Sequence, residues 1–420
     1  MTPRTTKLLF IALAVLWAMW IIQSCFNGPH IDISALYMAG WMVANGQSEL
    51  IYLAPSHIFN AEPMPLWDEV MTAQGQDAQV VTAYVYPPIW AALLAVPAHA
   101  MSAATFFKAT FLLHVAGALA SAFLAFTLTP HRQHPTPMHQ GLIAFAVLFF
   151  SFPAFNAFLN NQPQITVTFL ILAAMWLVSR EQSIRGGALL GLAIAIKVSP
   201  ILFALIFVMR RDWRALGAAL AVSGGIALTS LLVMGWPLHA QFLEQLSKIN
   251  AMIVMTKLNF SPEALLFQAS EFFRAAAMPD GRALAVYTAP EPLWITVLSK
   301  AALILALVFF WRGGRRIDPA TALPVQLLLL SLIAALLGPL SWAHYFFMPL
   351  LLLPALFVIM PPKQAWGWIV LTLLVSSVKT FSLLHSFNDH FMLTALVPAL
   401  LFFALLLRAL FAVQKPAAHP

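Results

Sequence analysis

Charge is the scarcest property of this chain. Only 9% of its 420 residues are Asp, Glu, Lys or Arg, whereas 61% are hydrophobic and the mean hydropathy is +0.85. A soluble globular domain carries about 25% charged residues, because its surface faces water. Here apolar runs of about 20 residues, long enough to cross a bilayer, recur from end to end. The composition excludes an ordinary soluble protein and indicates a single integral membrane domain over residues 1–420.

Cysteine and the common cofactor motifs are also nearly absent. The single cysteine, Cys25, has no partner for an internal disulfide. The chain contains no P-loop, Rossmann glycine fingerprint, HExxH zinc helix or Gly-x-Ser-x-Gly elbow. It also lacks an Asp-x-Asp pair in its polar loops, so we expect neither a cofactor nor a dedicated metal site. The net charge of +7 comes from short basic clusters between apolar runs, which favours membrane loops over nucleic-acid binding.

The apolar runs predict an all-α, polytopic transmembrane bundle of about 12 spans. Backbone groups in lipid must pair within a helix or a closed barrel, and these uniformly apolar runs do not alternate as barrel strands do. The first run lacks a small-x-small cleavage site, so we expect an uncleaved span rather than a signal peptide. The predicted spans are 8–26, 87–102, 104–129, 141–158, 163–179, 185–209, 214–235, 293–311, 321–337, 345–360, 365–384 and 391–411.

Lys and Arg predict the orientation of the bundle. Residues 27–85 contain six acids and no Lys or Arg, whereas basic clusters lie near both ends of the chain. The positive-inside rule therefore predicts cytoplasmic termini, two long outer loops, 27–85 and 236–292, and two short outer segments, 338–344 and 385–390. In the first loop, apolar residues of 33–45 recur at helical spacing, which predicts an amphipathic helix on the membrane surface.

Two basic stretches conflict with this orientation. Residues 130–140 and 180–185 have cytoplasmic character, yet uninterrupted spans throughout would place both outside. The conflict disappears if 87–102 and 185–209 are broken, re-entrant elements, and their prolines make that possible. The residues alone leave this choice open.

Ionisable and amide side chains near the predicted membrane boundary are candidates for function. Asp32 is suited to act as a general base, or to cap the helix predicted after it. Asn161 and Gln162 belong to an amide-rich island that forms either a turn or a group of donors to sugar hydroxyls. Lys197 falls in the interior of the run 185–209, where its ammonium suits a lipid phosphate or a structural ion pair.

Aromatic side chains accompany these polar residues. Tyr86 precedes Pro87-Pro88 at the start of a predicted helix, and Trp342, His344 and Tyr345 follow a later span. Such groups commonly form interfacial belts. His344 also suits a role in orienting a phosphate or sharing a proton.

In order, these segments resemble glycosyltransferase family 87, the polyprenol-phosphate-mannose-dependent mannosyltransferases of bacterial membranes. The matching pieces are Asp32 with Tyr37, Tyr86-Pro87-Pro88, Asn161-Gln162, Gly187 to Pro200, and Ser341-Trp342-Ala343-His344-Tyr345. Asn259-Phe260-Ser261 corresponds loosely to an Asn-x-Ser element of the family.

The resemblance implies a C-type glycosyltransferase fold and an inverting transfer of a sugar, with mannose expected, from a polyprenyl-phosphate carrier. The acceptor would be a lipid or glycan at the outer face of a bacterial inner membrane, with membrane lipids as the other partners. Asp32 would be the base, and Lys197 and His344 would hold the donor phosphate. Tyr37, Tyr86, Asn161, Gln162, Trp342 and Tyr345 are further substrate-binding candidates.

A transporter or flippase of lipid-linked saccharides is the alternative. Such a protein is expected to distribute polar groups through the bilayer midplane on paired half-helices. The polar segments of this sequence instead gather towards one face, with Lys197 as the exception. This distribution favours the enzyme.

Overall fold

The computed structural model describes residues 3–52, 65–76, 82–130, 135–270, 286–338, 340–386 and 392–414. The predicted outer loops 27–85 and 236–292 therefore lie partly outside the described residues. Helices dominate the structure, and a two-stranded antiparallel ribbon pairs β1 (Met252–Met255) with β2 (Tyr287–Pro290). The expected all-α class is confirmed.

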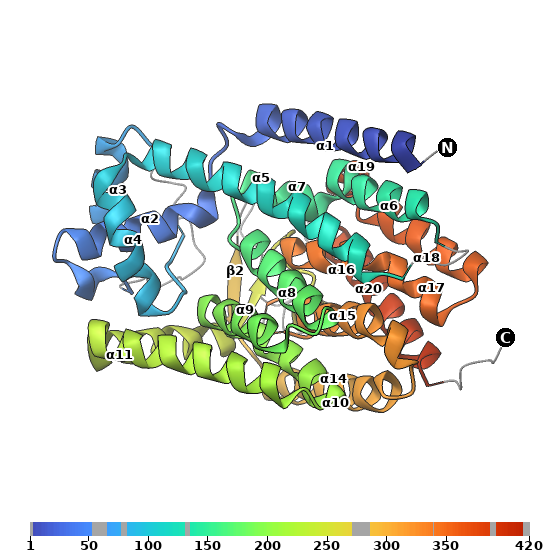
Figure 1. Ribbon diagram of the computed structural model, residues 1–420. Coiled ribbons are helices and arrows are strands. Elements are labelled where there is room, and N and C mark those ends of the chain that lie inside the picture. The colour runs from blue at the N-terminus through green and yellow to red at the C-terminus, as the bar shows by residue number, and fades with distance from the viewer. Residues whose placement is uncertain are drawn as a thin grey trace.

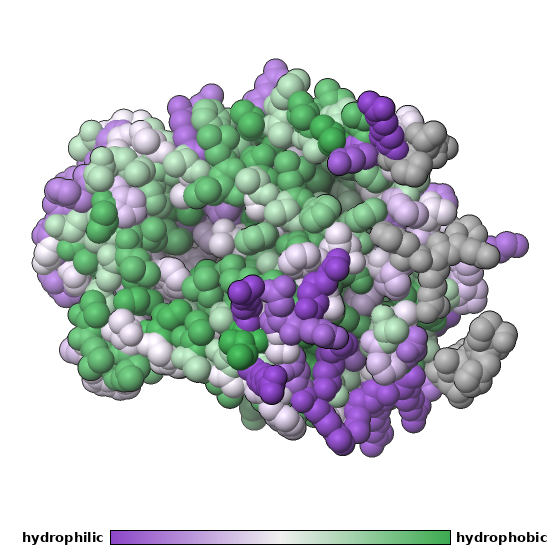
Figure 2. Space-filling model, in the orientation of Figure 1, coloured by the Kyte–Doolittle hydropathy of each residue, from purple (hydrophilic) through white to green (hydrophobic). Residues whose placement is uncertain are grey.

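In the part of the chain that the structure describes, six helices are long and apolar enough to cross a membrane, and they make this a multi-pass membrane protein. They are α1 (Pro3–Cys25), α5 (Ala103–Leu128), α11 (Trp213–Asn250), α14 (Leu293–Gly314), α15 (Pro319–Leu336) and α20 (Met392–Ala412). Helix α11 consists of two helical segments that meet at a kink at Gly235 (φ 75°). The most apolar windows differ in burial, from 83% of residues buried in α15 to 11% in α11. Helix α15 is thus the centre of the bundle, whereas α11 presents most of its apolar surface outward. Figure 2 shows the resulting hydrophobic exterior.

The other apolar runs fold as shorter helices that complete the bundle. Among the described residues these are α2 (Ile31–Ala44), α3 (Pro65–Ala73), α4 (Pro88–Ala100), α6 (Pro137–Phe150), α7 (Phe152–Leu159), α8 (Gln164–Ser179), α9 (Ser183–Ile196), α10 (Ala204–Arg210), α12 (Pro262–Ala269), α16 (Phe347–Leu351), α17 (Leu356–Ile359), α18 (Pro362–Val375) and α19 (Val378–Ser386). Short 3₁₀ turns link them: η1 (Ser48–Leu50), η3 (Ser199–Phe203), η4 (Ala343–Phe346) and η5 (Leu353–Ala355).

The predicted span 87–102 forms α4, a helix of 13 residues that packs along α2. A helix of that length extends ~20 Å, which is short for the hydrocarbon core of a bilayer. The packing is close, because a Cβ added at Gly40 of α2 would lie 2.6 Å from the carbonyl oxygen of Leu94. Figure 1 shows α2, α3 and α4 grouped at one end of the molecule, at the left of the view. Eight of the 14 residues of α2 are buried in this group.

The predicted span 185–209 is broken. Helix α9 ends at Ile196, Lys197 is extended at φ −148° and ψ 130°, and the chain continues through η3 into α10. Gly187 and Gly191 lie against the backbone of α11 at Ala215 and Ala219, so α9 and α11 run parallel. The start of α9 and the end of α10 therefore lie at the same end of α11. Lys197 is at the tip of a hairpin, so the structure adopts the broken course that the sequence left open for 185–209.

Arginine residues gather at the end of the bundle opposite α2–α4. Phe10 of α1 contacts Gly141 of α6, which places the N-terminal ends of these two helices together. His139 packs its ring on Trp366 at 5.2 Å, and Arg408 donates to Gln364 at 2.6 Å, which adds α18 and α20 to the same end. In Figure 1 the N-terminal end of α1 and the label of α10 lie towards the right, away from α2–α4.

Candidate active site

Asp32 lies in the first turn of α2, at the end of the bundle away from the arginine residues. The helix begins after His30, whose left-handed conformation (φ 50°) turns the chain out of α1. The backbone N–H of Asp32 donates to the carbonyl of Asn160 at 3.1 Å. Its Oδ2 accepts a hydrogen bond from Gln162 Nε2 at 2.7 Å. Asp32 is inside the helix rather than before it, so the N-cap interpretation of this residue is wrong.

The surroundings of Asp32 favour a carboxyl group that exchanges protons near neutrality. Burial raises the pKa of Asp32 to about 7, while the charge of Lys197 and the hydrogen bond from Gln162 act in the opposite direction. Desolvation penalises the ionised form, and a nearby cation or donor stabilises it. A base with a pKa near the working pH is efficient in proton transfer.

The two predicted amides point in different directions. Asn161 adopts a left-handed conformation (φ 50°) in the turn between α7 and α8. Its Oδ1 lies 2.7 Å from His114 Nδ1, and its Nδ2 donates to the Phe107 carbonyl at 2.9 Å. Asn161 is therefore anchored on α5, away from Asp32. This anchoring fixes the turn from which Gln162 reaches the carboxylate.

Lys197 reaches the same site from the tip of the α9–α10 hairpin. Its Nζ donates to Gln164 Oε1 at 3.0 Å and lies 3.9 Å from the ring centroid of Tyr345. The end of α9 is held in place by Trp90, whose indole N–H donates to the Ala195 carbonyl at 2.8 Å. An ammonium over an aromatic face is stabilised by the ring quadrupole.

The segment from Trp342 to Tyr345 lines the site opposite Asp32. Asn259 holds this segment, since its Oδ1 accepts from the backbone N–H of Ser341 at 3.0 Å and its Nδ2 donates to the Val254 carbonyl. His344 is 6% exposed, and its ring lies 4.7 Å from that of Tyr345 and stacks at 6.5 Å on Trp342.

The two remaining candidate tyrosines, Tyr86 and Tyr37, lie in different surroundings. Tyr86 lies just before α4, and burial raises the pKa of its phenol well above the usual value, with further contributions from Asp32 and Tyr345. Tyr86 is thus a neighbour of the carboxylate. Tyr37 is completely buried, packs on Phe106 and Phe107, and donates to the Met101 carbonyl at 3.3 Å. The structure does not bring Tyr37 to the site.

The assembled groups are a carboxyl group with an amide donor and an amine beside an aromatic ring. A carboxylate with a donor partner faces an ammonium, and Asp32, Lys197 and Tyr345 all keep part of their surface exposed. Figure 2 shows a hollow in the hydrophobic face between the α2–α4 group and the rest of the bundle. In the described part of the chain, no three His, Cys, Asp or Glu side chains form a group able to hold a metal ion.

Three supporting residues were not among the sequence candidates. Gln164 lies in the predicted amide island, and its contact with Lys197 depends on the broken course of 185–209. Trp90 lies in the predicted aromatic segment, but its acceptor is 105 residues away along the chain. His114 lies within an apolar run, where a lone histidine is a usable signal because ionisable residues are rare in spans.

The middle of the chain is similar to known proteins. A family model described as glycosyltransferase family 87 matches residues 84–339. The chain is 27% identical over 213 residues to the polyprenol-phosphate-mannose-dependent alpha-(1-2)-phosphatidylinositol pentamannoside mannosyltransferase of Mycobacterium tuberculosis (strain CDC 1551 / Oshkosh), covering 49% of this chain and 44% of the relative. It is 28% identical over 201 residues to the polyprenol-phosphate-mannose-dependent alpha-(1-2)-phosphatidylinositol mannoside mannosyltransferase of Mycobacterium tuberculosis (strain ATCC 25618 / H37Rv), covering 47% of this chain and 41% of the relative.

The chain spans less than half the length of these two relatives. The family match includes Tyr86, Gln162 and Lys197, while Asp32 and the segment from Trp342 to Tyr345 flank it on either side. More than half of the sequence lies within the match, which confirms the resemblance expected from the sequence: the chain belongs to glycosyltransferase family 87.

Proposed function

We propose that this protein transfers a sugar, mannose by analogy with its relatives, from a polyprenyl-phosphate carrier to a lipid or glycan hydroxyl. The observation that carries the proposal is the convergence of Asp32, Gln162 and Lys197 from three distant parts of the chain at one end of the bundle. A base beside an anion-binding group is what a displacement with a phosphate leaving group requires. The names of the two relatives supply the donor class.

The reaction follows from these groups. The Asp32 carboxylate takes the proton of the acceptor hydroxyl while the hydroxyl oxygen attacks the anomeric carbon of the donor. The bond from that carbon to the phosphate oxygen breaks, and the polyprenyl phosphate leaves with the electron pair. Attack from the face opposite the leaving group inverts the anomeric centre. Gln162 holds the carboxylate in place through its hydrogen bond at 2.7 Å.

Lys197 is the proposed partner of the donor phosphate. Its ammonium compensates the charge that develops on the leaving oxygen, and Gln164 and Tyr345 fix its position. His344 and Trp342 complete the wall beside Tyr345. Val198 and Ile201 follow Lys197 and are 53% and 47% exposed, which provides an apolar path for the prenyl chain beside the phosphate.

The proposed orientation places the site at the outer face of a bacterial inner membrane. The end of the bundle that bears Arg4, Arg210 and Arg408 would face the cytoplasm, together with both termini. With α4 outside the membrane and α9–α10 as a hairpin, residues 130–140 and 180–185 also fall on the cytoplasmic side. This arrangement removes the conflict noted in the sequence.

The test is transfer by the purified protein. Wild type, Asp32→Asn and Asp212→Asn would be incubated with radiolabelled polyprenyl-phosphate-mannose and a membrane lipid extract. Asp212 caps α11 by accepting from the Ala215 N–H at 3.0 Å, and asparagine caps a helix equally well. We expect label transfer by wild type and by Asp212→Asn, and a loss of at least about 100-fold in Asp32→Asn.

Two results would contradict the proposal. Full transfer by Asp32→Asn would place the base elsewhere. Absence of transfer by folded wild type, combined with movement of lipid-linked sugar across sealed vesicles, would identify the protein as a transporter.

A further inference from the structure

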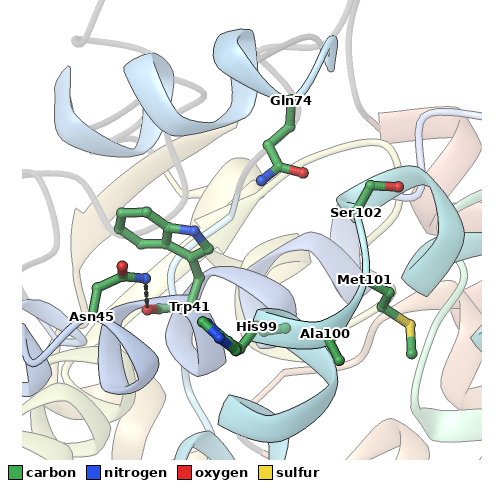
Figure 3. A pocket seen from close by; sticks show the side chains of 8 residues that line it. Trp41, Asn45, Gln74, His99, Ala100, Met101 and Ser102 are labelled. Atoms are coloured by element: carbon green, nitrogen blue, oxygen red, sulfur yellow. Dashed lines mark hydrogen bonds between the residues drawn. The ribbon is translucent and has the colours of Figure 1, made fainter.

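A second pocket lies at the far end of α2 from Asp32. Its volume is about 370 Å3, and it opens between the end of α2, the segment after α3 and the turn that joins α4 to α5. The lining residues are Trp41, Asn45, Gln74, Ala98, His99, Ala100, Met101 and Ser102. Figure 3 shows Trp41 and His99 on one side of this pocket and Gln74 and Ser102 on the other. No Asp, Glu, Lys or Arg is among these residues.

The pocket offers several hydrogen-bonding groups and one aromatic wall. Gln74 Oε1 accepts from the Ala103 N–H at 3.1 Å, and the Gln74 side chain also interacts with the Tyr37 hydroxyl, so this amide is held in place at the pocket. Asn45 donates through Nδ2 to the Trp41 carbonyl at 2.8 Å, which leaves its side-chain oxygen available. His99 is exposed and adds an imidazole. The Trp41 indole supplies both an apolar face and an N–H donor.

This pocket is distinct from the reaction centre. Trp41 follows Asp32 by nine residues, which corresponds to ~14 Å along the helix and about half a turn around it. The two side chains therefore project from opposite faces of α2. None of Asp32, Gln162, Lys197 or Tyr345 lines the pocket.

The chemistry of the lining selects the ligand. An anionic ligand would find no Lys or Arg among the lining residues, and a purely apolar ligand would make no hydrogen bonds with the amides and the imidazole. An uncharged ring with several hydroxyl groups needs no cationic partner and can form hydrogen bonds with the lining side chains. It pairs with the amide and imidazole groups and places its apolar edges against the indole.

We propose that this pocket is a secondary binding site for a neutral saccharide unit. This proposed site is additional to the transfer reaction, because a saccharide bound in the pocket needs no contact with Asp32 or Lys197. A glycan bound there would be held at the same end of the bundle as the reaction centre while α2 separates it from the reacting atoms.

The experiment measures direct binding of α-(1-2)-mannobiose to the full-length protein by isothermal titration, in a detergent without a sugar headgroup. We expect saturable binding with a Kd on the order of 1 mM, and weaker binding of mannose 6-phosphate. Trp41→Ala is expected to raise the Kd of α-(1-2)-mannobiose for the pocket at least about tenfold, which equals ~1.4 kcal/mol. His99→Ala, at an exposed position, is expected to raise this Kd severalfold.

Two controls separate this site from the catalytic one. Trp213→Ala removes another tryptophan, 61% exposed and at the arginine-rich end of the bundle, and is expected to bind normally. Asp32→Asn is expected to bind the disaccharide normally even though it abolishes transfer. The proposal is overturned if wild type shows no saturable binding up to about tenfold above the expected Kd. It is also overturned if binding survives both Trp41→Ala and His99→Ala, or is lost in Asp32→Asn.

Discussion

The hydrogen bond from Gln162 to Asp32 makes a quantitative prediction about pH dependence. A hydrogen bond to a charged group contributes about 1.5–3 kcal/mol, and one pKa unit equals 1.36 kcal/mol. Replacing Gln162 with Met removes the donor at 2.7 Å and keeps a side chain of similar length. The carboxylate loses its stabilising partner, so the pKa of Asp32 is expected to rise from about 7 by about 1–2 units.

The consequence is a shift of the acid limb of the kcat/KM profile to higher pH. At pH 7 about half of the wild-type carboxyl is ionised, whereas about a tenth to a hundredth is ionised in Gln162→Met. Transfer from radiolabelled polyprenyl-phosphate-mannose at pH 7 should therefore fall about 5- to 50-fold, and the loss should shrink at pH 9.

A matched control distinguishes this effect from general damage. Gln326 is also buried and donates through Nε2 to the Gly314 carbonyl at 3.2 Å, at the other end of the bundle. Gln326→Met should leave the apparent pKa of the profile unchanged, whatever its effect on expression. A lower plateau in Gln162→Met with an unchanged apparent pKa would refute the assignment of Asp32 as the titrating base.

Three further predictions follow, two on charge and one on the packing of α9 against α11. The folded state raises the pKa of Asp32 above its unfolded value near 3.9, so ionisation of this carboxyl destabilises the protein progressively as the pH rises from about 4 to about 7. Asp32→Asn should therefore raise the Tm relative to wild type more at pH 8 than at pH 5. An equal Tm difference at the two pH values would contradict a buried carboxyl group at Asp32. Lys197→Met should raise the KM for the donor and move the acid limb of the kcat/KM profile to higher pH, because the carboxylate of Asp32 loses a nearby positive charge. Lys197→Arg keeps the charge and should leave the acid limb at the wild-type pH. Identical pH profiles for the two variants would argue against an electrostatic role of Lys197. Gly187→Val should abolish transfer, because the valine side chain would collide with the Ala215 carbonyl of α11. Gly224→Ala places its methyl group in open space and should leave the protein unchanged or stabilise it against thermal unfolding by up to about 1 kcal/mol. Tolerance of Gly187→Val would show that α9 and α11 separate easily.

Much of the scaffold follows from the sequence because lipid leaves few options. Runs such as 104–129 and 293–311 correspond closely to α5 and α14, since their backbone must pair within one helix. The run 185–209 was ambiguous, because an apolar stretch of that length is compatible with one span or with a hairpin. The deciding contact, of Gly187 and Gly191 with α11, joins residues about 28 positions apart, and no local pattern reveals it.

The sequence predicts which residue types belong to the candidate site, but it does not predict which of their side chains contact one another. Asp32, Gln162 and Lys197 stand out as polar residues among apolar neighbours, and the structure brings them together. Asn161 has the same local signal as Gln162, yet it faces the opposite way because its left-handed backbone turns it towards His114. Tyr37 is separated from Asp32 by five residues, or ~140° around α2, which already points it to another face.

The parallel contact of α9 with α11 has a consequence for the membrane itself. Helix α11 has little buried surface, so its position along the membrane normal is set chiefly by the match between its apolar length and the surrounding acyl chains. Because α9 is locked against α11 without room for a methyl group at Gly187, the height of Lys197 follows the height of α11. Under the proposed role of Lys197, bilayer thickness therefore sets the height of its ammonium relative to the lipid phosphate layer. Activity in vesicles of graded acyl-chain length is expected to pass through an optimum.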